Sequence, residues 1–131
     1  MTTQDVSARD RAALQGVWRQ LRCEADGVVD PHDDLSAGVF TTIDAAQFSV
    51  HTPEGELVLR GSFVLDATTT PKSITWIDSV GPDGGKHLPA IYTLQGDAFT
   101  FIAADEGCPR PSEFRTTKGL TMRSLLRVTK P

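Results

Sequence analysis

The run Leu14–Arg19 most constrains the fold, because it places a glycine two residues ahead of a tryptophan, just after a short amphipathic lead-in. A small barrel needs one large flat ring to close its floor, and Gly16 leaves room for the incoming chain to cross beneath Trp18. This arrangement is typical of the point at which a chain enters a closed β-barrel. We therefore expect the strands that follow to wrap around Trp18.

The first residues of the chain predict a short helix. Ser7 and Asp10 resemble a capping box, with Asp in place of the preferred Glu or Gln. The helix would begin near Ser7 and end near Leu14 after about two turns. We expect residues 1–13 to form this lead-in and residues 14–131 to form one barrel domain, since 131 residues lie in the usual range for a single domain.

Strand patterns recur along the rest of the chain at hairpin distances. Glu56–Asp66 shows the clearest alternation of apolar and polar residues, and Gly61 within it predicts a bend. Two prolines exclude a central strand from Asp105–Thr117, and Val28–Ala37 is also expected to be a loop. About eight runs have strand character: Val17–Ala25, Gly38–Ile43, Gln47–Thr52, Glu56–Asp66, Ser73–Val80, His87–Leu94, Ala98–Ala104 and Met122–Thr129. With one short helix in front, they predict an all-β, antiparallel up-and-down barrel, which leaves no exposed sheet edge.

The first strand leaves the direction of its two faces open. Three polar residues share a face with its tryptophan: Gln20, Arg22 and Glu24. Polar side chains inside a closed lumen are costly unless they are hydrated or bound. Either these side chains face a ligand, or a bulge turns them outward.

Composition restricts the partners and the compartment. The net charge is −4, with 13 Lys plus Arg against 17 Asp plus Glu, so the chain lacks the basic balance that nucleic acid and anionic membranes require. Met1–Asp10 carries charges and no apolar run, which argues against a secretory signal, and no later stretch is long enough to span a bilayer. We interpret Cys23 and Cys108 as free thiols in a reducing compartment, with a single disulfide between them as the alternative. The expected location is the cytoplasm.

Short segments spread over nearly the whole chain carry a family resemblance. They are Leu14–Trp18, Arg60–Asp66, Pro71–Ile74, Gly81–Lys86, Ile91–Tyr92, Gly96–Asp97 and Arg110–Phe114. In these segments the chain resembles an uncharacterised bacterial family of lipocalin-like domains. The resemblance implies a calycin-type barrel but no established substrate.

Lipocalins proper also share a Gly-x-Trp in the first strand and a basic side chain from the last strand that lies over the tryptophan ring. The resemblance implies these structural roles for Gly16, Trp18 and Arg127. A cation–π contact between Arg127 and Trp18 would contribute about 0.5 to 2 kcal/mol to stability. The Thr-Asp-Tyr motif of lipocalins proper is absent from the sequence.

Aromatic residues on the later strands are the candidates to line a cavity. An eight-stranded barrel is about wide enough to hold one small ligand, and ligand cavities are lined mainly by apolar and aromatic side chains. The candidates are Trp76, Tyr92, Phe99 and Phe101. The alternative is that these rings simply fill the core.

Arg22 and Arg110 are the candidates for a polar anchor of a ligand. The prolines on either side of Arg110 fix the backbone and would hold its guanidinium over the barrel mouth, where it can pair with a carboxylate. The alternative is an internal pair between Arg110 and Glu113 that pins the loop.

Three titratable residues are candidates for proton transfer if the cavity is an enzyme site: His87, Asp78 and Glu113. His87 follows a glycine loop, where a strand begins at the barrel rim; the alternative is an exposed histidine at a loop edge. No spacing of His, Cys, Asp or Glu predicts a metal site, and no serine-centred nucleophile elbow is present. We predict no metal and no cofactor.

These observations leave three functions open. The favoured one is a binding module that holds a small, largely apolar molecule in the barrel. The second is a cyclase or isomerase that folds a small organic substrate in the same cavity and moves a proton. The third is a packed barrel that acts on a protein partner through its outer surface.

Overall fold

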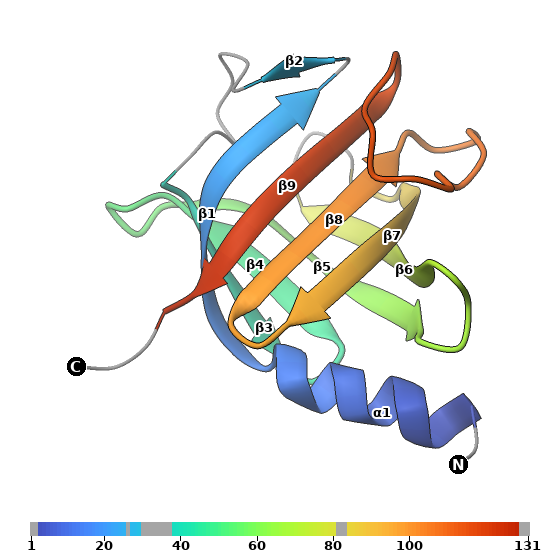
Figure 1. Ribbon diagram of the computed structural model, residues 1–131. Helices are drawn as coiled ribbons and strands as arrows, with labels where there is room; N and C mark the ends of the chain where they lie inside the picture. Colours follow the sequence, from blue (N-terminus) through green and yellow to red (C-terminus); the bar gives the residue numbers. More distant parts are fainter. Residues whose placement is uncertain (1–2, 26, 30–37, 81–83, 129–131) are drawn as a thin grey trace.

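The computed structural model describes residues 3–25, 27–29, 38–80 and 84–128. Over these residues one helix precedes nine strands, which confirms the predicted all-β class (Figure 1). The elements are α1 (Thr3–Leu14), β1 (Gly16–Ala25), β2 (Val28–Val29), β3 (Phe40–Asp44), β4 (Gln47–His51), β5 (Leu57–Asp66), β6 (Lys72–Val80), β7 (His87–Gln95), β8 (Ala98–Ala104) and β9 (Leu120–Arg127).

The strands close into a barrel with α1 at one end (Figure 1). In the order β1, β3, β4, β5, β6, β7, β8 and β9, each strand pairs antiparallel with the next, and β9 pairs back to β1. The predicted eight-stranded, antiparallel up-and-down barrel is therefore confirmed. β2 is a two-residue addition to the end of β1, where Val29 pairs with Glu24. The predicted loop Val28–Ala37 thus begins with a short strand, and its residues 30–37 lie outside the described residues.

α1 begins at Thr3, earlier than the predicted start near Ser7. The hydroxyl of Ser7 accepts a hydrogen bond from the backbone N–H of Ala67 (3.0 Å), and Asp10 is buried against the barrel. The predicted capping box is therefore wrong, because contacts with the barrel, rather than the start of the helix, take up these two side chains. The predicted end at Leu14 is confirmed.

A β-bulge in β1 decides which side chains of this strand face inward. The register against β9 shifts between Gln20 and Arg22, so that Leu21 is the extra residue. Gln20 and Cys23 are buried, whereas Leu21 and Arg22 are exposed. Of the polar residues that share a face with Trp18, Gln20 therefore stays inside and Arg22 turns outward.

Trp18 closes the floor of the barrel. Its ring is fully buried, and its indole N–H donates to the backbone oxygen of Leu14 (2.9 Å). The guanidinium carbon of Arg127 lies 4.3 Å from the ring centroid, so the expected cation–π contact is present. Gly16 has a φ of +122°, and a Cβ there would lie 3.4 Å from the Arg127 side chain, so glycine suits this position.

The same guanidinium ties the helix to the barrel. Arg127 donates to the backbone oxygens of Ala13, in the last turn of α1, and of Gln15 (2.8 Å), just after the helix. It also donates to the Oδ1 atom of Asp97 (3.0 Å). A cation is favourable here because the last carbonyl groups of a helix lack partners within it. One residue of the last strand therefore fixes the helix end over the barrel floor.

A second buried region lies on the outer side of β7 and β8. Ile91 and Ile102 are opposite each other on these strands and are 1% and 0% exposed, although they alternate with residues that point into the barrel. Segment 105–119 connects β8 to β9 and folds back against this region, because its Arg110 donates to the backbone oxygen of Ala90 (2.7 Å). No strand is present within this described segment, as the two prolines predict.

The structure bears on two further predictions, one about a disulfide between the cysteines and one about a membrane-spanning stretch. Cys23 is buried and Cys108 is exposed, and the two thiols form no disulfide with each other. Among the residues that the structure describes, no helix is both long and apolar enough to cross a membrane.

Candidate functional site

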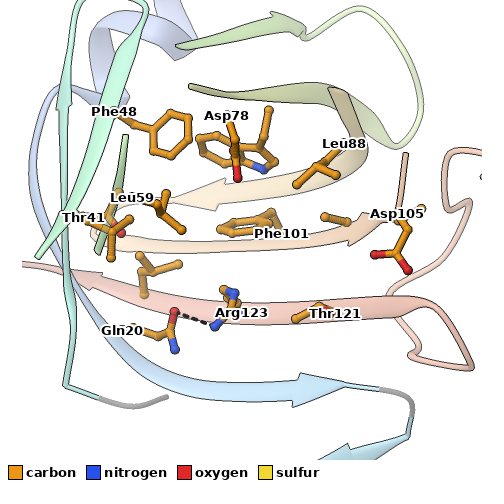
Figure 2. A pocket seen from close by; sticks show the side chains of 15 residues that line it. Gln20, Thr41, Phe48, Leu59, Asp78, Leu88, Phe101, Asp105, Thr121 and Arg123 are labelled. Carbon is orange, nitrogen blue, oxygen red and sulfur yellow. Dashed lines mark hydrogen bonds between the residues drawn. The ribbon is translucent and has the colours of Figure 1, made fainter. Parts of the chain in front are cut away.

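The barrel contains a cavity of about 140 Å³ (Figure 2). Residues from the ends of β6 and β8 and from the starts of β7 and β9 line it, and antiparallel pairing brings these strand ends to one rim. The other end of β9 contacts α1 through Arg127, so the cavity lies at the end of the barrel opposite the helix. Its apolar lining is Phe48, Val50, Leu59, Trp76, Leu88, Phe101, Ala103, Ala104 and Leu125, and its polar lining is Gln20, Thr41, Asp78, Asp105, Thr121 and Arg123.

β6 contributes an aromatic and an acidic side chain to one wall. Strand alternation directs Ile74, Trp76 and Asp78 inward, and all three are at most 5% exposed. The loop after β6 holds the backbone of Asp78, whose N–H donates to Lys86 (3.1 Å) and whose oxygen accepts from Gly85 (2.6 Å). The carboxylate of Asp78 is therefore placed in the cavity wall by a fixed backbone (Figure 2).

A second polar group lies across the cavity from Asp78 (Figure 2). Arg123 of β9 pairs in register with Phe101 of β8, and its Nη1 atom donates to the amide oxygen of Gln20 (3.3 Å). Gln20 is only 3% exposed. The cavity thus has an acid on one side and a guanidinium joined to an amide on the other, with apolar groups between them.

Trp76 is the centre of the aromatic wall. Its ring centroid lies 4.9 Å from that of Phe101, 5.0 Å from that of Phe48 and 5.7 Å from that of Phe63. The planes are tilted or edge to face, which are favourable arrangements for aromatic rings. These contacts restrain the rings, so the apolar part of the cavity is formed before any ligand enters.

The indole N–H of Trp76 has no protein acceptor among the described residues, although its nitrogen is buried. Leaving a buried donor unpaired costs about 1 to 3 kcal/mol, and most buried polar groups in proteins are paired. The indole of Trp18, by contrast, donates to Leu14. Trp76 is also one of the residues that line the cavity.

Two of the four predicted aromatic residues line this cavity, and two do not. Trp76 and Phe101 are in its wall. Phe99 lies nearer the floor, where its ring packs 5.6 Å from Trp18, and it is fully buried. The hydroxyl of Tyr92 donates to Asp10 of α1 (2.8 Å). Phe99 and Tyr92 therefore fill the core between the cavity and the helix, which corrects their assignment to the lining.

Neither of the predicted polar anchors lies in the cavity wall. The bulge in β1 exposes Arg22. Arg110 donates to the backbone oxygens of Ile74 (2.9 Å) and Ala90 and to the hydroxyl of Thr75 (2.8 Å). Arg110 therefore pins segment 105–119 to β6 and β7, and its partners are these residues rather than the predicted Glu113.

The guanidinium that does line the cavity belongs to Arg123, which the sequence interpretation missed. A signal for it exists in the alternation of β9, because Arg123, Leu125 and Arg127 share one face. Since the sequence predicts Arg127 over the floor tryptophan, the same reasoning places Arg123 inside the barrel.

Of the three candidates for proton transfer, only Asp78 lines the cavity. His87 is exposed, and its backbone N–H donates to the carboxylate of Glu106 (3.0 Å). Glu113 is exposed in segment 105–119. His87 thus matches the alternative of an exposed histidine at a loop edge.

Comparisons with family models, with curated proteins and with solved structures found no match to this chain. Within the described part of the chain, no group of three or more His, Cys, Asp or Glu side chains is arranged to hold a metal ion. The chemistry of the site therefore has to be argued from the cavity itself, which offers aromatic surface, one buried carboxylate and one guanidinium–amide pair.

Proposed function

We propose that this chain binds one small, largely apolar molecule in the barrel cavity. The observation that carries the proposal is the cavity of about 140 Å³, in which an aromatic and aliphatic wall is interrupted by a few polar side chains. Binding sites for small molecules typically combine mostly apolar walls with a small number of placed polar groups. An eight-stranded barrel is also about wide enough to hold one such molecule.

Thermal unfolding with toluene, cyclohexane and hexane tests this proposal. A ligand that binds only the folded protein raises Tm, and the rise grows with ligand concentration. We expect at least one of the three compounds to raise Tm in this way. No rise with any of them or with acetophenone, up to their solubility limits, would contradict the proposal.

Two alanines of β8 provide a matched pair of variants for this experiment. Ala103 lines the cavity, whereas Ala98 is exposed on the same strand. Ala103→Leu should fill part of the cavity and remove the ligand-dependent rise in Tm. Ala98→Leu should retain that rise, and equal behaviour of the two variants would show that the compounds bind elsewhere.

A second candidate function is a cyclase or isomerase, and the burial of Asp78 in the cavity wall is the observation that favours it. A carboxyl group in contact with a bound substrate can accept or donate a proton during rearrangement. The test incubates the protein with compounds extracted from its host and searches for products of unchanged mass and altered retention time. Asp78→Asn should slow such a reaction by about 10²-fold or more, whereas Glu113→Gln should leave it unchanged.

The proposal also includes a location and a class of partner. The partner is a small molecule rather than nucleic acid or a membrane, because the net charge is −4. The location is the cytoplasm, where cysteines that form no disulfide, such as Cys23 and Cys108, stay reduced. Fractionation of host cells checks this location, and recovery of the protein with the membrane or the external fraction would contradict it.

A further inference from the structure

The volume of the cavity and the indole N–H of Trp76 together indicate which class of small molecule the cavity binds. We propose that the cavity selects a neutral, single-ring molecule that carries a hydrogen-bond acceptor, and that the indole N–H of Trp76 donates to this acceptor. This inference rests on the proposed binding function and goes beyond it, because it names the ligand class and the residue that recognises it.

The volume sets the size of the ligand. The cavity has about 140 Å³, and a protein cavity of about 150 Å³ with an apolar lining takes up benzene. A single ring with a short substituent therefore fits this volume. Phe48, Trp76 and Phe101 surround this space with aromatic surface on which a flat ring can pack.

The charges in the wall favour a neutral molecule. Asp78 and Arg123 lie on opposite sides of the cavity (Figure 2), so each of these charges offsets part of the attraction that the other exerts on an ion. An ionised ligand would also lose its hydration on entering a mostly apolar space. A neutral polar group avoids this loss.

The indole N–H decides the kind of polar group. Trp76 is 5% exposed, and its nitrogen has no acceptor among the described residues. An indole N–H can only donate, so it requires an oxygen or nitrogen acceptor on the ligand. A carbonyl or ether oxygen attached to the ring meets this requirement, whereas a pure hydrocarbon leaves the donor unpaired.

Acetophenone and α-methylstyrene are suitable probes, because they share one planar shape and differ by an oxygen in place of a methylene group. Their affinities are measured for the wild-type protein and for Trp76→Phe. The variant should weaken binding of acetophenone about three- to tenfold more than binding of α-methylstyrene, since only acetophenone loses a hydrogen bond. This double comparison cancels the different hydrophobicities of the two probes.

Phe48→Leu is the matched control. It alters the aromatic wall next to Trp76 without removing a donor, because Phe48 packs edge to face on the indole at 5.0 Å. It should change the affinities of both probes by a similar factor. A selective loss of acetophenone in Phe48→Leu would mean that shape, rather than the indole N–H, distinguishes the probes.

An NMR measurement observes the donor directly. The chain has two tryptophans, so the spectrum has two indole N–H signals, and Trp18 serves as the internal reference because it donates to Leu14. Acetophenone should move the proton signal of Trp76 to higher frequency, as a new hydrogen bond does. It should leave the signal of Trp18 in place.

The outcomes separate the two proposals. If both probes bind and Trp76→Phe weakens them equally, or if bound acetophenone leaves the Trp76 signal unmoved, a water or another group satisfies the indole; the ligand class is then wrong and the binding function stands. If neither probe binds and no compound of the thermal panel raises Tm, both proposals fail.

Discussion

Arg127 illustrates how much of this barrel depends on single side chains. Its guanidinium packs on Trp18 at 4.3 Å and donates to two backbone oxygens at the end of α1. Arg127→Ala removes the cation–π contact and these hydrogen bonds, so it should lower the free energy of unfolding by about 1 to 3 kcal/mol.

Urea unfolding measures this loss. Arg22→Ala is the control, because Arg22 is exposed beyond the bulge of β1 and its removal should change stability by no more than about 0.5 kcal/mol. Equal losses in the two variants would show that the barrel floor does not depend on Arg127.

Tyr92 gives the protein a defined response to high pH. Burial and the hydrogen bond to Asp10 raise the pKa of Tyr92 far above its ordinary value of 10.0. In the unfolded chain the phenol ionises near pH 10, whereas in the folded protein it keeps its proton. The folded state then binds more protons than the unfolded state, so stability is complete below about pH 10 and falls as the pH rises above it.

Absorbance near 295 nm checks this prediction, because Tyr92 is the single tyrosine of the chain. The native protein should show no phenolate at pH 11, and urea-unfolded protein should titrate near pH 10. Tyr92→Phe should lose stability less steeply between pH 10 and pH 11.5 than the wild-type protein. A native phenolate that appears at pH 10 would contradict the account.

At the scale of elements, β5 and β6 approach each other closely, and both contribute residues to the cavity wall. Their register shifts between Arg60 and Gly61, which agrees with the bend that the sequence predicts at this glycine. A Cβ at Gly61 would overlap the backbone oxygen of Ile77 and would lie 2.9 Å from the Cα of Asp78 and from the ring of Phe48. Glycine at this position therefore allows β5 and β6 to pair closely next to Phe48 and Asp78, which both line the cavity.

Gly61→Ala should consequently destabilise the protein by about 1 to 3 kcal/mol through overpacking. Its effect should extend to the cavity, since Phe48 and Asp78 both have to move. Ser62→Ala, one residue further along β5, should be nearly neutral. Chemical denaturation compares the two variants, and similar midpoints would show that β5 and β6 can separate at little cost.

Segment 105–119 behaves as an element of its own, because Arg110 fastens it to the backbone of β6 and β7. Arg110→Ala should speed hydrogen exchange within this segment and leave exchange in β3 to β5 unchanged. The control is Arg115→Ala, an exposed residue of the same segment. Unchanged exchange in Arg110→Ala would show that other contacts hold the segment in place.

For the whole molecule, the fold follows from the sequence more directly than the cavity does. The alternation of apolar residues and the Gly16–Trp18 pair predict the closed barrel, because both are local patterns. The bulge at Leu21 adds one residue to β1 relative to β9, and nothing local in the sequence marks it. It is the reason why Arg22 turns outward, although simple alternation would place it on the same face as Trp18 and Gln20.

The site is accordingly predicted in part. Trp76 and Asp78 follow from the alternation of β6, and Phe101 follows from that of β8. The sequence does not separate Phe101 in the cavity wall from Phe99 below it. The depth of each ring along the barrel axis depends on strand register and on the position of α1.

Native mass spectrometry of the protein purified from its own host tests the central claim, that the cavity holds a small molecule, most directly. The native spectrum is compared with that of the same sample after denaturation and organic extraction. We predict a stoichiometric adduct with the mass of a single-ring compound, which is lost on denaturation and is missing from Ala103→Leu. An adduct-free native spectrum, together with no thermal protection by the apolar compounds, would contradict the account.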